Sequence, residues 1–245
     1  MTSSHEPSYR HFADTRWSMV VRLGTGQTRD AGSALIALCV RYWYPVYAYV
    51  RRCGHAPAIA QNLTGSFLQH LFQDFRDGAQ LHAQGQFRRY LLERLNVFLA
   101  SDCRDASSDE TVAELAIPPA DLEQRNLRDN AGTESSEQVY QRSFALEVLS
   151  RAFANLREEA RETGHLDMYE ALEPCLTSDP AAGEYAELAQ RLRMRPLALT
   201  VALKRLRQRW RELIDRELID TVASADELIA EREALHAALS AGVEP

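Results

Sequence analysis

The side chains of this 245-residue chain that could do chemistry are mainly its arginines, and their pattern favours binding over catalysis. The sequence contains no phosphate-binding loop and no Ser-His-Asp arrangement, and its seven histidines show no paired spacing. The four cysteines lack a CxxC pair and have no histidine at metal-ligand spacing, which predicts that no zinc site forms. We therefore expect a protein that is not an enzyme and uses neither a metal nor a cofactor.

The densest cationic segment runs from Arg191 to Arg211 and holds eight basic residues and no acid. A run of charge is usually the solvated face of an ordinary helix. This run coincides with the pattern of a helix-turn-helix, in which a short support helix precedes a longer basic recognition helix. The coincidence favours a segment that binds DNA, with a basic amphipathic helical hairpin as the alternative.

Two predicted helices flank a short turn in this segment. Residues 185–192 place Leu188, Ala189 and Leu192 on one apolar face. Arg193 falls where many such turns carry glycine. The turn must therefore be formed by a residue with a side chain, which could adopt the left-handed conformation at modest cost. Pro196 suits the first position of the second helix. The apolar face of that helix consists of Leu199, Leu203, Leu206, Trp210 and Leu213, and its expected DNA contacts are Arg195, Thr200, Lys204, Arg205, Arg207 and Arg209.

The N-terminal hundred residues are also predicted to be helical, because apolar residues recur at three- to four-residue spacing without β-type alternation. The expected helices start near Thr15, cover 34–52 with a kink or restart at Pro45, cover 58–75 after Pro57, and cover 87–100. Arginines lie next to aromatic residues here. Trp43, Tyr44, Phe87 and Tyr90 could stack on unpaired bases while Arg88 and Arg89 hold phosphates, or the aromatic rings could form the core.

Charge divides the chain unevenly, although its formal net charge is −7. Residues 1–104 carry a net charge of +5, and residues 105–137, with nine acids and two arginines, carry −7. The acidic stretch has scattered apolar residues and predicts a flexible linker. We expect helical domains over 1–104 and 138–217, joined by that linker and followed by a helical extension over 218–245. Leu218, Val222 and Leu228 could pack the extension on the helix-turn-helix domain, where its acids could shield the basic helix.

No apolar run approaches the roughly 20 residues of a membrane span, and the N-terminal residues lack the apolar core of a signal peptide. Four widely spaced thiols fit a reducing compartment. The sequence therefore predicts a cytoplasmic protein without a membrane partner.

Several stretches together resemble the extracytoplasmic-function (ECF) sigma factors of bacterial RNA polymerase. They are Thr-Arg-Trp-Ser-Met-Val at 15–20, Tyr-Trp-Tyr-Pro-Val-Tyr-Ala-Tyr-Val-Arg-Arg at 42–52, Asn-Leu-Thr at 62–64 with Phe67, Gln-Phe-Arg-Arg-Tyr-Leu-Leu at 86–92, and the helix-turn-helix at 185–213. The resemblance implies an all-α fold whose region-two domain docks on core polymerase and opens the −10 element. It also implies a region-four domain that recognises the −35 element. The implied partners are promoter DNA and the β′ coiled coil and β flap of the polymerase.

The sequence departs from this family on the helix after Pro57. Members of the family usually carry acids there that face a basic coiled coil of the β′ subunit, whereas 57–73 contains no acid. The positions that the resemblance assigns to polymerase binding are Ile59, Gln61, Asn62, Thr64 and Ser66. A phosphate on Thr64 would restore negative charge, so we expect activation by a Ser/Thr kinase, with Ser66 as a rival acceptor. A conventional helix-turn-helix regulator and a sigma-mimicking interaction protein are the competing interpretations.

Overall fold

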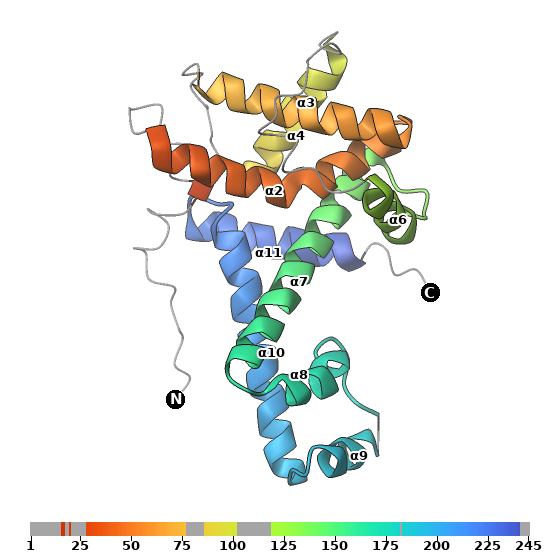
Figure 1. Ribbon diagram of the computed structural model, residues 1–245, viewed down its shortest axis with the longest axis vertical. Helices are drawn as coiled ribbons and strands as arrows, with labels where there is room; N and C mark the ends of the chain where they lie inside the picture. Colours follow the sequence, from red (N-terminus) through yellow and green to blue (C-terminus); the bar gives the residue numbers. More distant parts are fainter. Residues whose placement is uncertain are drawn as a thin grey trace. The chain divides into compact units, whose positions relative to one another are not determined.

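The computed structural model describes residues 16–17, 20, 28–76, 86–101, 119–181 and 183–240, and these residues form helices and connections without a strand. The predicted all-α fold is confirmed (Figure 1). The elements are α2 (Thr28–Arg52), α3 (Pro57–Arg76), α4 (Phe87–Ala100), α6 (Pro119–Asp129), α7 (Ser136–Glu162), α8 (Leu166–Leu172), the 3-10 helix η3 (Glu173–Cys175), α9 (Glu184–Arg191), α10 (Pro196–Ile219) and α11 (Ala225–Ser240).

The chain divides into two compact units. The first contains the described residues up to Glu147 together with those from Leu218 onward, and the second contains Val148–Glu217. None of the described helices combines the length and the apolar character that crossing a membrane requires.

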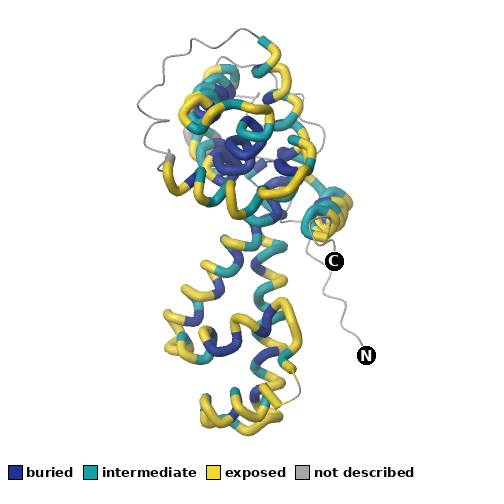
Figure 2. The backbone as a smooth tube through the Cα atoms, turned by 90° about the vertical axis from the view of Figure 1, so that its right-hand side faces the viewer, coloured by how far each residue is buried: buried dark blue, intermediate teal, exposed yellow. Residues whose placement is uncertain are grey.

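The core of the first unit is rich in aromatic side chains from α2 and α4. Trp43 is 2% exposed, Tyr44 1% and Phe87 0%, so they belong to the core and are not available to stack on bases. The ring of Phe87 lies 4.8 Å from that of Trp17 and 5.0 Å from that of Tyr42 between centroids. Figure 2 shows the buried residues in dark blue. Pro45 lies inside α2, which is one helix in the structure, so no new helix starts at this proline.

The predicted flexible linker over 105–137 is wrong for its described part, because 119–129 forms α6 and docks on α2. Glu123 accepts hydrogen bonds from Arg51 at 2.8 Å and 2.5 Å and from the Tyr47 hydroxyl at 2.6 Å. Leu122 is 1% exposed in the same helix. Glu123, one of the acids that indicated a solvated tether, is therefore neutralised by Arg51 of α2, while Leu122 anchors the helix.

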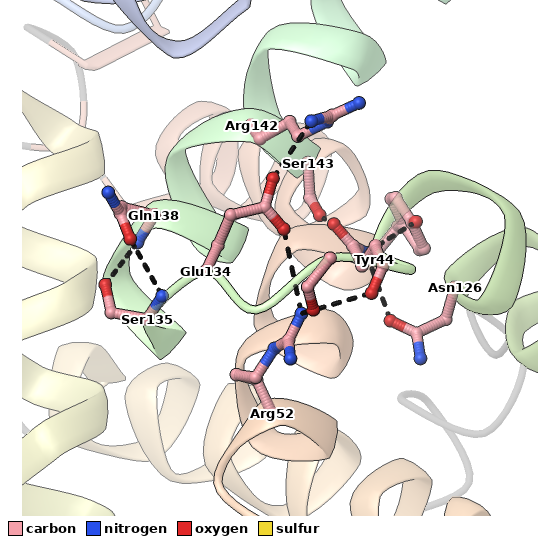
Figure 3. Close-up of polar contacts among 10 residues, drawn as sticks. Tyr44, Arg52, Asn126, Glu134, Ser135, Gln138, Arg142 and Ser143 are labelled. Carbon is pink, nitrogen blue, oxygen red and sulfur yellow. Dashed lines mark hydrogen bonds and ion pairs between the residues drawn. The ribbon is translucent and has the colours of Figure 1, made fainter. Parts of the chain in front are cut away.

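The turn from α6 into α7 is also ordered by polar contacts (Figure 3). Arg52 donates to the carbonyl of Gly132 at 2.8 Å and lies 3.7 Å from the carboxylate of Glu134. Ser135 and Gln138 form a capping box, because each side chain bonds the backbone N–H of the other at 3.2 Å and 2.8 Å. This cap starts α7 before residue 138, and the first unit continues along α7 to Glu147, beyond the predicted boundary.

The C-terminal extension belongs to the first unit, which overturns its predicted packing on the helix-turn-helix domain. The carbonyl of Asp220 accepts from the N–H of Trp17, and the carbonyl of Thr221 accepts from the N–H of Phe87, both at 3.0 Å. The Asp220 carboxylate lies 3.1 Å from Arg41. Leu218 and Val222 are fully buried. The apolar face predicted for this segment exists, but its partners are the N-terminal helices, and their arginines pair with its acids.

Candidate nucleic-acid interface

The turn between α9 and α10 has the hydrogen bonds of a Schellman motif. The N–H of Met194 donates to the carbonyl of Ala189 at 2.8 Å, and the N–H of Arg193 donates to that of Gln190 at 3.1 Å. Arg193 has a φ of 52°, so it adopts the left-handed conformation that the sequence required of a non-glycine residue. The turn ends α9 at Arg191, and Pro196 begins α10 as predicted.

The inner face of α10 is the predicted apolar one. Leu199, Leu203 and Leu213 are at most 2% exposed, and the ring of Trp210 lies 5.1 Å from that of Phe153 on α7. They share one core with buried residues of α7, α8 and α9. Because this face is fixed against the unit, the opposite face of the first three turns of α10 is directed to solvent.

Four of the six predicted DNA contacts are exposed there, namely Arg195, Thr200, Lys204 and Arg205. Within the described part of the chain, no ion pair uses the three cationic members of this group. The Thr200 hydroxyl donates to the carbonyl of Pro196 at 3.1 Å, and its side chain remains at the surface. These residues could meet the acceptor groups of phosphates and base edges.

Arg207 and Arg209 are engaged inside the unit, which corrects their assignment to DNA. Arg207 donates to the carbonyl of Cys175 at 2.6 Å and pairs with Asp179 at 2.7 Å. Arg209 forms a two-point ion pair with Glu159 at 2.6 Å and 2.8 Å. Hydrogen bonding from Arg209 lowers the pKa of Glu159, so the carboxylate stays charged to a lower pH than an ordinary glutamate does. Both arginines lie on the flanks of α10, where neighbouring elements supply acceptors.

The structure also exposes residues that the sequence analysis left out of the interface. Leu197 is 77% and Val201 42% exposed on the outward face, and Gln208 and Arg211 are exposed farther along α10. A helical projection of 197–211 would have found them, because together they centre on the side of α10 opposite the apolar face of Leu199, Leu203 and Leu206.

In the first unit, the two arginines that were expected to hold DNA phosphates have different environments. Arg88 is 7% exposed and lies against Glu231 of α11, whose carboxylate its guanidinium contacts at 2.9, 3.1 and 3.2 Å. Its role as a DNA contact is therefore wrong for this conformation, because the α11 carboxylate occupies its donors. Arg89 is exposed and lies 3.3 Å from Glu93 on the same helix.

The expected polymerase-docking helix, α3, has no acid in its first turn. Ile59 is 51% exposed and Asn62 is exposed, whereas Gln61 and Ser66 are half-buried. Thr64 is fully buried and donates its hydroxyl to the carbonyl of Ala60 at 2.8 Å. This burial corrects the prediction that Thr64 is the phosphorylation site. Its side chain lies on the core side of α3, and this fold does not present it to a kinase.

Across the described residues, no group of three or more histidine, cysteine or acidic side chains is placed to hold a metal ion. Comparison of the chain with family descriptions, curated proteins and solved structures gave no match.

Proposed function

We propose that this protein is a promoter-specificity subunit of bacterial RNA polymerase, an ECF-type sigma factor that acts in the cytoplasm. The single observation that carries the proposal is the outward face of α10, which follows a Schellman turn and exposes Lys204 and Arg205, with Arg195 exposed just before the helix, in a segment from Arg191 to Arg211 that contains no acid. In this proposal α10 enters the major groove of the −35 element, and its cations contact phosphates and guanine edges.

The first unit would supply the polymerase contact and the −10 interaction. The exposed positions Ile59 and Asn62 on α3 are its candidate docking residues, and Arg89 is the exposed cation on α4. Arg88 would become available only after the ion pair to Glu231 opens. This requirement makes the described arrangement a resting form in the proposal.

A conventional helix-turn-helix regulator is the second candidate function. It is favoured by the absence of acids from residues 57–73 of α3 and by the burial of Arg88, because both weaken the case for polymerase binding and leave the case for DNA binding intact. The sigma function requires stable binding to core polymerase, whereas a conventional regulator binds DNA without it.

The deciding experiment mixes the full-length protein with core RNA polymerase and measures co-elution, then transcription from promoters enriched by the complex. Co-elution and initiation at those promoters support the sigma function. DNA binding without co-elution identifies the conventional regulator. Loss of promoter binding in Arg205→Ala, but not in Arg161→Ala, checks that α10 is responsible, because Arg161 is an exposed arginine of the same unit outside the turn and α10.

We further propose that phosphorylation of α3 by a Ser/Thr kinase strengthens polymerase binding, because a phosphate adds about −2 charges to the acid-free stretch 57–73 of that helix. Ser66 is the more accessible acceptor, and Thr64 would first have to give up its bond to Ala60. Phosphopeptide mapping of the protein from its native cells, with Thr64→Ala and Ser66→Ala as matched variants, identifies the acceptor. An unmodified α3 under conditions that activate transcription would refute this part of the proposal.

A further inference from the structure

The outward face of α10 changes character along its length. Its first two turns present Leu197 and Val201, which lie one turn apart and are 77% and 42% exposed. The following turns present Lys204, Gln208 and Arg211. The five follow one another at spacings of four, three, four and three residues, so they form one stripe along α10 that is apolar at its start and polar or basic beyond.

Exposed apolar residues at this position need a partner, because burial of Leu and Val is favourable and the unit itself leaves them in solvent. Residues at the N-terminal end of a recognition helix are those that meet base edges in the major groove. The one apolar group on a base edge in that groove is the C5-methyl of thymine. The basic continuation of the stripe favours a polyanionic partner over an uncharged one.

We infer that Leu197 and Val201 recognise thymine methyl groups in the DNA bound by α10. This inference rests on the proposed function and deepens it, because it assigns sequence specificity to two residues that carry no hydrogen-bonding side chain. Lys204 and Arg211 then anchor the helix on the backbone. The rival occupant is an apolar segment of a protein, since Leu197 and Val201 themselves line a groove of about 880 Å³, together with residues such as Met168 and Met194.

The test uses deoxyuridine, which lacks only the C5-methyl of thymine. Full-length protein, alone and bound to core polymerase, first selects a duplex from a random pool. Each thymine of that duplex is then replaced singly by deoxyuridine. We expect one or two replacements to weaken binding about fourfold each, the factor for losing one buried methylene-sized group.

The same replacements should have no effect on Leu197→Ala or Val201→Ala at the thymine that each residue contacts. Ile229→Ala is the matched control, because Ile229 is 53% exposed on α11 of the other unit, and it should keep the fourfold response. Circular dichroism of each variant checks that the helices are retained.

The outcomes separate the inference from the function on which it rests. A duplex that binds tightly but tolerates every replacement overturns the inference and leaves DNA binding established. Variants that lose polymerase association while keeping the thymine response assign the stripe to a protein partner and also overturn it. If no duplex is selected in either form, the proposed function and the inference fall together.

Discussion

Breaking the ion pair between Arg88 and Glu231 by removing one partner should strongly destabilise the first unit. The Glu231 side chain is fully buried and that of Arg88 is 9% exposed. If one partner is removed, little water can therefore solvate the charge that remains. Removing one partner of a buried pair costs about 3 to 5 kcal/mol, because the other charge stays desolvated without compensation. Glu231→Gln keeps one acceptor oxygen, so we expect a loss near the lower figure, about 3 kcal/mol in the free energy of unfolding.

Urea unfolding followed by far-ultraviolet circular dichroism measures this loss. The matched control is Glu233→Gln, which changes an exposed acid two residues farther along α11 and should shift the free energy by less than about 0.5 kcal/mol. The double variant Arg88→Met with Glu231→Leu should recover most of the stability, because a buried pair is often replaceable by apolar residues of similar size. Equal effects of Glu231→Gln and Glu233→Gln would refute the reasoning.

Three further predictions concern other contacts. Arg51 holds the pKa of Glu123 below its usual value. This pair therefore contributes stability above the unfolded pKa and loses that contribution as pH falls through the folded pKa. The difference in unfolding free energy between wild type and Glu123→Gln should shrink between about pH 6 and pH 3. Arg193→Gly should raise the unfolding free energy by about 1 kcal/mol, because glycine adopts a φ of 52° without the steric cost, and a loss of stability there would contradict the assigned turn. In DNA titrations, Arg205→Ala should reduce the slope of log affinity against log salt by about one, whereas Arg207→Ala should leave the slope unchanged and lower thermal stability.

The helix-turn-helix could be predicted from the sequence because its signals are local. The apolar period of 199–213, the proline at 196 and the strained position at Arg193 each lie within one or two turns of the feature they specify. The assignment of individual cations was less successful. Arg207 and Arg209 are indistinguishable from Lys204 and Arg205 by composition, and only tertiary acceptors on η3 and α7 separate the two pairs.

The acidic segments were misjudged for a related reason. A stretch such as 119–129 carries more acids than arginines, and in isolation it should remain solvated. Its stability comes from Arg51 and Tyr47, about 70 residues earlier in the chain, which no local pattern reveals. Thr64 is different, because the signal was present: it lies three and four residues before Phe67 and Leu68, on the side of α3 that those residues bury.

The distribution of ion pairs explains how a chain of net charge −7 could still bind DNA. Many of its acids are taken up by arginines within the fold, as in Glu123 with Arg51, Asp220 with Arg41 and Glu159 with Arg209. Such pairs have little field at a distance, because their opposite charges lie within about 3 Å of each other. The cations of the outward face of α10 instead lie in a stretch, 191–211, that contains no acid, so we expect an approaching phosphate to meet a positive potential there. The negative net charge of the protein then slows its encounter with DNA at low salt without preventing it. The rate of association with DNA should therefore fall less steeply with added salt than the affinity does.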